Sequence, residues 1–91
     1  MDSNKDKKVT SIDGHNRSAE REKEINDHFL TTFSAPSGKK VLQYLRSITI
    51  ESVAGPNISD TELRHREGMR FVVGITETRI KGGEYERNKS K

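Results

Sequence analysis

The side chains of this chain that are capable of chemistry are three histidines, scattered carboxylates and several serines. His15, His28 and His65 lie far apart in the sequence, without the i, i+4 pairing that lets one helix present two imidazoles to a metal. The HExxH pattern is absent, and the chain has no cysteine, which excludes thiolate ligands and thiol nucleophiles. We therefore expect surface histidines and neither a metal nor a cofactor.

Neighbouring carboxylates are the next candidates, for acid and base catalysis. Glu20 and Glu24 fall on one exposed face of a predicted helix, while Asp60 and Glu62 fall at a helix start, where the helix dipole favours negative charge. Four serines are the remaining nucleophile candidates: Ser34, Ser37, Ser47 and Ser52. No base neighbours them in the sequence and no nucleophile-elbow motif is present. We predict that the protein is not an enzyme.

An arginine cluster is the most distinctive group of charges. On a helix Arg66 and Arg70 are i, i+4 neighbours, and Glu67 can pair with Arg64 or Arg70. The simpler interpretation is an exposed ion network, which contributes little stability. The alternative is a contact face for a partner chain, because arginine is enriched at interfaces and a bare glycine backbone admits a close neighbour. The candidate partner-contact residues are Arg64, Arg66, Glu67, Gly68 and Arg70.

The net charge of +3 and the pI of about 9.3 raise the alternative of nucleic-acid binding. The excess of basic residues is spread along the chain, with no basic run longer than a lysine pair, whereas a DNA-binding surface normally concentrates its basic residues on one face. The candidate nucleic-acid contacts are Lys39, Lys40 and Arg46. Solubility is the simpler explanation for these three.

The elements that must position these side chains belong to one small domain. With 91 residues, 29% of them hydrophobic and 34% charged, the chain is near the lower limit for a stable core. The lack of cysteine suits a reducing cytoplasm. The longest apolar run, residues 71–73, is too short to cross a bilayer, and the first residues do not resemble a signal peptide. We expect a soluble protein that is not exported and does not insert into a membrane.

Apolar periodicity predicts two helices in the first half of the chain. Ser18 can cap a helix over residues 18–33, whose first turns are acidic. Its apolar stripe consists of Ile25, Phe29, Leu30 and Phe33. Pro36 sets a turn, and Ser37 is a plausible cap for a second helix over residues 36–48. The stripe of this helix consists of Val41, Leu42, Leu45 and Ile48.

The stretch "HREGMRFVVGIT", residues 65–76, is ambiguous between helix and strand. Ser59 and Glu62 match a capping box, which predicts a third helix over residues 59–81, whereas the β-branched residues that follow have strand propensity. We favour the helix because the cap needs a helix to begin and no partner strand is evident. Each internal glycine then costs about 1 kcal/mol relative to alanine, and close helix approach at Gly68 or Gly74 is the expected compensation.

The polar stretches at residues 1–17 and 82–91 have too few apolar groups to offset the entropy of ordering, so we predict two disordered tails around a helical domain at 18–81. The predicted fold is all-α, a small three-helix bundle made of a helical hairpin and a longer C-terminal helix. Its core is so small that we also expect a homo-oligomer, or docking on a larger partner through the third helix.

Two stretches, "FLTTFSAPSGKKVLQYLRSI" and "HREGMRFVVGITETRI", together resemble a family of small proteins. The family is encoded in the structural and DNA-packaging gene cassettes of tailed bacteriophages and prophages of the short-tailed type. The resemblance covers residues 29–80, and Gly74 departs from the family's pattern. The matching positions are Phe33, Gly38, Val41, Leu42, Leu45, Arg46, Glu67, Gly68, Arg70 and Ile75.

The resemblance implies a non-enzymatic accessory protein in virion structure or morphogenesis. Its expected partners are phage structural or packaging proteins, and its expected location is the host cytoplasm or the virion. The alternative function is a small basic nucleic-acid-binding module that assists DNA packaging or regulation.

Overall fold

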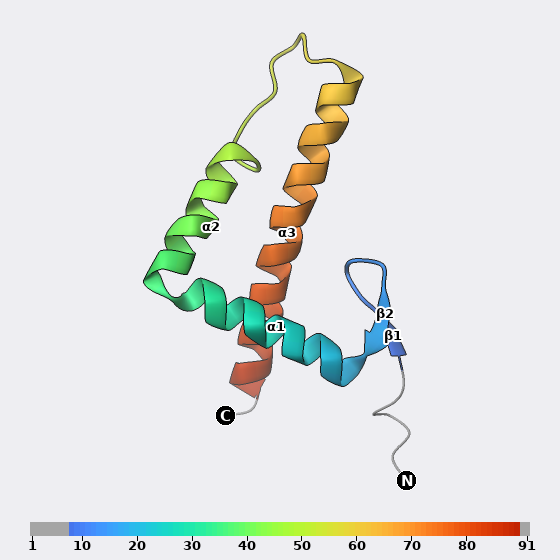
Figure 1. The fold of residues 1–91 in the computed structure, drawn as a ribbon, viewed down its shortest axis with the longest axis vertical. Helices are drawn as coiled ribbons and strands as arrows, with labels where there is room; N and C mark the ends of the chain where they lie inside the picture. Colours follow the sequence, from blue (N-terminus) through green and yellow to red (C-terminus); the bar gives the residue numbers. More distant parts are fainter. Residues whose placement is uncertain (1–7, 90–91) are drawn as a thin grey trace.

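A computed structural model describes residues 8–89 of the chain (Figure 1). A short hairpin of two strands precedes three helices along the chain. The elements are β1 (Lys8–Thr10), β2 (Asn16–Ser18), α1 (Ala19–Ser34), α2 (Pro36–Ile48) and α3 (Asp60–Lys89). The protein is therefore mostly helical, in agreement with the predicted all-α class, with a two-stranded sheet in addition. The tail predictions for residues 1–7 and 90–91 lie outside the described part.

The hairpin corrects the prediction of a disordered N-terminal tail over residues 8–17. β1 and β2 pair antiparallel, with Val9 opposite Arg17. The turn between them is closed by a hydrogen bond from the Ser11 amide to the His15 carbonyl, at 2.8 Å. Gly14 takes a positive φ of 86°, which glycine adopts without steric cost. Ile12, Asp13 and Gly14 thus form a three-residue hairpin loop with glycine in the left-handed conformation, and this turn chemistry outweighs the polar composition of the strands.

The first two helices begin close to the predicted positions. The Ser18 hydroxyl accepts the Arg21 amide at 3.1 Å, so the predicted cap of α1 is confirmed. The cap predicted for α2 is wrong, because the helix begins at Pro36 and the residue before it is Ala35 rather than Ser37. Proline fits this first helical position because its missing N–H would have no helical partner.

Helix α3 settles the ambiguity of residues 65–76, which are helical throughout. Ser59 accepts the Glu62 amide at 3.1 Å, as the capping box predicts. The helix does not end at residue 81 but continues to Lys89, which corrects the prediction of a disordered tail for residues 82–89. The reason lies in tertiary packing, because Gly82 and Gly83 are the point at which α1 crosses α3.

The glycines of this crossing explain its closeness. A Cβ at Gly83 would lie 2.8 Å from both the Asn26 carbonyl oxygen and the Leu30 Cβ, which leaves no room for a side chain. Gly68 and Gly74, where close approach was expected, have no other group within 4 Å of such a Cβ. That expectation is therefore wrong within this chain. On α3 the close approach occurs at Gly82 and Gly83, which the sequence places in a predicted tail.

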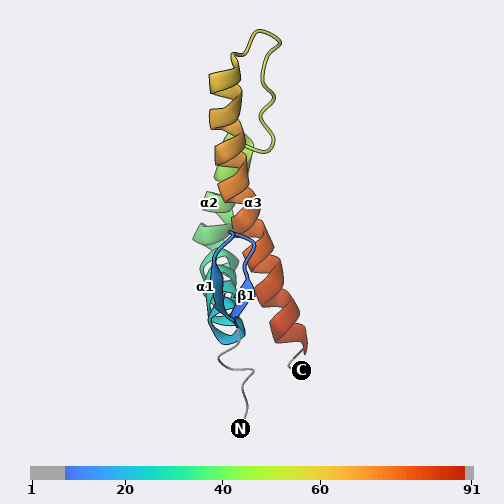
Figure 2. The ribbon, with the colours of Figure 1, turned by 90° about the vertical axis from the view of Figure 1, so that its right-hand side faces the viewer.

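The three helices lie in a thin, elongated layer rather than in a closed bundle (Figures 1 and 2). The principal extents are 59 × 30 × 15 Å. Helix α1 packs across the C-terminal half of α3, while α2 touches α3 much less. Among the described residues, Leu30 and Val73 are the only large apolar side chains that are buried. The predicted three-helix bundle is therefore not confirmed, because α2 has little contact with α3 and the three helices do not enclose a common core.

Candidate protein-contact surface

Large apolar side chains remain exposed on much of the layer. Most of them lie on α2, on the loop after it and on the N-terminal half of α3. The set comprises Val41, Tyr44, Ile48, Val53, Leu63, Met69, Phe71 and Val72. Val53 is the extreme case, at 88% exposure. Single exposed apolar residues are ordinary on protein surfaces, whereas exposed apolar residues that lie together are characteristic of a contact site.

Helix α2 carries the most regular part of this surface. Val41, Tyr44 and Ile48 are separated by three and four residues, so they lie along one face of the helix, and all three are exposed. We call these three residues the α2 stripe. Leu42 and Leu45, the other members of the predicted apolar face, are half-buried. The helix therefore uses only part of its apolar sector to hold the fold together.

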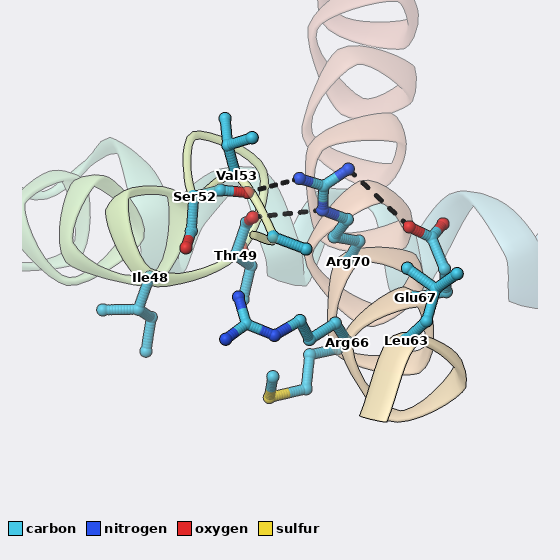
Figure 3. Close-up of a pocket in the computed structure, with 10 residues that line it drawn as sticks. Ile48, Thr49, Ser52, Val53, Leu63, Arg66, Glu67 and Arg70 are labelled. Atoms are coloured by element: carbon cyan, nitrogen blue, oxygen red, sulfur yellow. Dashed lines mark hydrogen bonds and ion pairs between the residues drawn. The ribbon is translucent and has the colours of Figure 1, made fainter. Parts of the chain in front are cut away.

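A pocket of about 200 Å³ continues the α2 stripe at its C-terminal end, and Ile48 belongs to both (Figure 3). It lies between the end of α2, the loop that follows and the first turns of α3. We call it the loop pocket. Its lining residues are Ile48, Thr49, Ser52, Val53, Ala54, Leu63, Arg66, Glu67, Met69 and Arg70. In Figure 3, Arg66 extends from α3 toward the end of α2. The pocket thus combines apolar walls with arginine side chains.

Arg70 holds this pocket in shape. Its Nε donates a hydrogen bond to the Thr49 carbonyl at 3.2 Å, and its Nη2 donates another to the Ser52 carbonyl (Figure 3). Glu67 lies 3.7 Å from the same guanidinium. These contacts fasten the loop after α2 to α3, since two carbonyls from the loop are satisfied by one side chain of the helix. Arg70 is therefore a structural residue of the surface.

The predicted partner-contact residues are only partly brought together. Arg66, Glu67 and Arg70 line the loop pocket, whereas Arg64 and Gly68 are exposed on α3 outside its lining. Arg66 is also 3.4 Å from Glu62, as an i, i+4 ion pair on one helix. The sequence identified the basic side of the pocket. It missed the apolar side, because those residues come from three separate segments: Ile48 at the end of α2, Val53 and Ala54 in the loop, and Leu63 and Met69 on α3.

The candidate nucleic-acid contacts do not form a common free edge. Lys39 and Lys40 are exposed in the first turns of α2, but Arg46 forms an ion pair with Glu77 of α3 and lies 3.4 Å from Glu51. The hydrogen bond to Glu77 is the main reason that the pKa of Arg46 is raised. Arg46 is thus neutralised within the chain and holds α2 against α3.

A cluster around Arg79 was not anticipated from the sequence. Arg79 is 3% exposed, in the middle of α3. Its Nη1 donates to the Glu22 carboxylate at 2.8 Å and to the Asn26 side-chain oxygen at 3.0 Å, both on α1. Its Nη2 donates to the Ser11 hydroxyl at 2.8 Å, in the hairpin turn. One buried guanidinium therefore joins the hairpin, α1 and α3.

Two further residues complete the Arg79 cluster. Asp13 lies 3.7 Å from Arg79, and Arg17 bridges Asp13 at 2.9 Å and Glu22 at 3.1 Å. The hydrogen bond from Arg17, followed by the one from the His15 amide, holds the pKa of Asp13 well below its usual range. The buried polar atoms of the cluster are satisfied among themselves, so it fastens elements together and offers no group to a ligand.

The remaining candidates for chemistry are dispersed. His15, His28 and His65 are exposed in three separate places, the hairpin turn, α1 and α3. Within residues 8–89, no group of three or more histidine, aspartate or glutamate side chains is placed to hold a metal ion. No helix in that part of the chain is both long and apolar enough to span a bilayer.

Comparisons of the chain with protein-family models, with curated proteins and with solved structures gave no match.

Proposed function

We propose that this protein acts without catalysis, by protein–protein contact through the α2 stripe and the loop pocket. The observation that carries the proposal is the exposed apolar surface along α2 and around the loop pocket. Burying a fully exposed side chain of this kind contributes about 1.5–3 kcal/mol, so the exposed apolar residues of this surface are an unused source of binding energy. They are Val41, Tyr44, Ile48, Val53, Leu63 and Met69. A chain that leaves this surface open is suited to a partner that covers it.

We further propose that the partners are structural or packaging proteins of a tailed phage or prophage, and that the role is in virion structure or morphogenesis. The support for this part is the resemblance of residues 29–80 to that class of small phage proteins. Self-association through α3 is compatible with this proposal, because Phe71 and Val72 are exposed on that helix outside the α2 stripe and the loop pocket.

Site-specific photo-cross-linking in the native host tests the proposal. A photoreactive amino acid at Val53, on the wall of the loop pocket, should cross-link the chain to a discrete protein partner during expression of phage structural genes. The same amino acid at Glu20, which is exposed at the start of α1, is the matched control and should give no specific product. Leu63→Asp should abolish the product formed at position 53. Equal products from both positions, or none from either, would contradict protein contact at this surface.

A further inference from the structure

Helix α2 is the least embedded of the three helices. None of its residues is buried, whereas α1 buries Leu30 and α3 buries Val73 and Arg79. The least exposed of its apolar side chains, Leu42 and Leu45, are only half-buried. The local stability of a segment depends largely on the apolar contacts that it buries. Helix α2 is therefore held in the fold less firmly than the crossing of α1 with α3.

Polar contacts at the C-terminal end of α2 join this helix to α3. Arg46 forms an ion pair with Glu77 of α3, and the two side chains remain 34% and 26% exposed. Arg70 of α3 donates hydrogen bonds to the carbonyls of Thr49 and Ser52, directly after the helix (Figure 3). An ion pair that is partly open to water contributes little stability. The attachment of this end of α2 is therefore weak.

The other end of α2 is connected directly to α1. Only Ala35 separates the two helices, and a Cβ at Gly38 would lie 3.0 Å from the Phe33 Cα. The polar contacts with α3 thus lie at one end of α2 and the connection to α1 at the other. The loop over residues 49–59 is long enough to follow a movement of its first residue. This arrangement allows α2 to leave α3 about the corner at Ala35 while the hairpin, α1 and α3 keep their contacts.

We propose that α2 is an arm that opens away from α3 independently of the rest of the fold, and that the ion pair of Arg46 with Glu77 is the latch that keeps it closed. The loop pocket is lined by Ile48 of α2 and by Leu63 and Met69 of α3, so it exists only while the arm is closed. A partner bound in the pocket should therefore stabilise the closed arm. This last step, the regulation of the contact site, rests on the proposed function.

Hydrogen–deuterium exchange of the full chain, followed amide by amide, tests whether the arm opens separately. An isolated helix of 13 residues is marginal in water, so α2 should lose its helical hydrogen bonds when it opens. After correction for intrinsic exchange rates, its amides should exchange at least about tenfold faster than those of the crossing between α1 and α3. Equal protection of the three helices would overturn the inference, because α2 would then open only when the whole chain unfolds.

Two glutamate variants test the latch. Glu77→Gln removes the ion pair between the helices and should make the α2 amides exchange about three- to fivefold faster, with no change at the crossing. Glu51→Gln is the matched control, because Glu51 lies 3.4 Å from the same arginine but belongs to the loop after α2. It should change α2 exchange by less than about twofold. Equal effects of the two variants, or faster exchange throughout the chain in Glu77→Gln, would overturn the latch.

The coupling to the contact site is tested on the cross-linked product formed at position 53. The α2 amides of the purified product should exchange about tenfold more slowly than those of the free chain, and unchanged exchange would overturn the coupling. The tests of the arm and the latch use the chain alone. An arm that does not open separately would therefore overturn the inference, while a specific cross-link at position 53 would still support the proposed function.

Discussion

At the scale of single residues, the N-terminal hairpin is fastened by charge and hydrogen bonds rather than by apolar packing. Its two large apolar side chains, Val9 and Ile12, are exposed, whereas Ser11 is buried against Arg79. An attachment of this kind depends on ionised carboxylates at Asp13 and Glu22. Its strength should therefore change with pH more than that of the helix crossing, which has apolar and backbone contacts besides the ion pair of Arg79 with Glu22.

Acid should release the hairpin from the Arg79 cluster. The pKa of Asp13 is lowered chiefly by Arg17, and for Glu22 the upward effect of burial is outweighed by hydrogen bonds from Arg79, Ser11 and Arg17, so its pKa is lowered too. A lowered pKa in the folded state means that the stabilisation is complete above the unfolded value, near pH 4, and is lost as the pH falls through the folded value. In a titration from neutral pH to about pH 2, the amide chemical shifts of the hairpin should move toward unfolded values at a higher pH than those of α2.

Arg79→Met is the control for this titration. It removes the buried cation, should cost about 3 kcal/mol, and should leave the hairpin detached already at neutral pH. If the hairpin and helix signals are lost together in acid, the hairpin does not detach independently of the helices and the prediction is wrong. The same conclusion would follow from a hairpin that remains docked in Arg79→Met.

At the scale of elements, α3 is a long helix that contains four glycines, Gly68, Gly74, Gly82 and Gly83. Each costs about 1 kcal/mol relative to alanine in an exposed helix interior. The crossing with α1 compensates the second pair, because the backbones approach too closely there for any side chain. Gly68 and Gly74 have no such compensation within the chain, so the two pairs should respond oppositely to alanine.

Alanine substitutions test this difference. Gly83→Ala should destabilise the protein by about 1–3 kcal/mol, because its Cβ would meet Asn26 and Leu30 of α1. Gly74→Ala should stabilise it by up to about 1 kcal/mol, because the added methyl meets open space in a regular helix. Urea unfolding followed by circular dichroism measures both free energies. A shift in the same direction for both variants would contradict the assigned roles.

At the scale of the whole molecule, the chain is much less compact than its length would allow. Its radius of gyration is 16.3 Å, whereas a compact domain of this length has about 12 Å. The thin layer has few positions at which a side chain is covered from both sides. Stability should therefore depend on a few buried residues, and the exposed apolar residues should be available for binding.

Substitutions at buried and exposed apolar positions should separate these roles. Leu30→Ala should cost about 2–4 kcal/mol, since Leu30 is 6% exposed at the helix crossing. Phe71→Ser, at 59% exposure, should change the free energy of unfolding by less than about 0.5 kcal/mol. Thermal unfolding of dilute protein provides the measurement. A large loss of stability in Phe71→Ser would mean that this face is covered in the isolated chain.

The sequence by itself determined where the helices begin and which faces are apolar. Ser18, Pro36 and Ser59 act on neighbours within one turn, and apolar periodicity is likewise local, so these features can be recognised without any knowledge of the fold. Arg66, Glu67 and Arg70 were singled out as a charged cluster for the same reason, because they are i, i+3 and i+4 neighbours on one helix.

Only the tertiary structure decided the docking of the hairpin, the full length of α3 and the open layer. The contacts of Arg79 join residues 53 to 68 positions apart, and nothing in the composition of either segment indicates such a pairing. A glycine pair such as Gly82 and Gly83 normally predicts the end of a helix. Here the contact with the α1 backbone explains why the helix continues. The physical reason is that caps and periodicity depend on a single segment, whereas a buried cation and a close helix crossing depend on two or three.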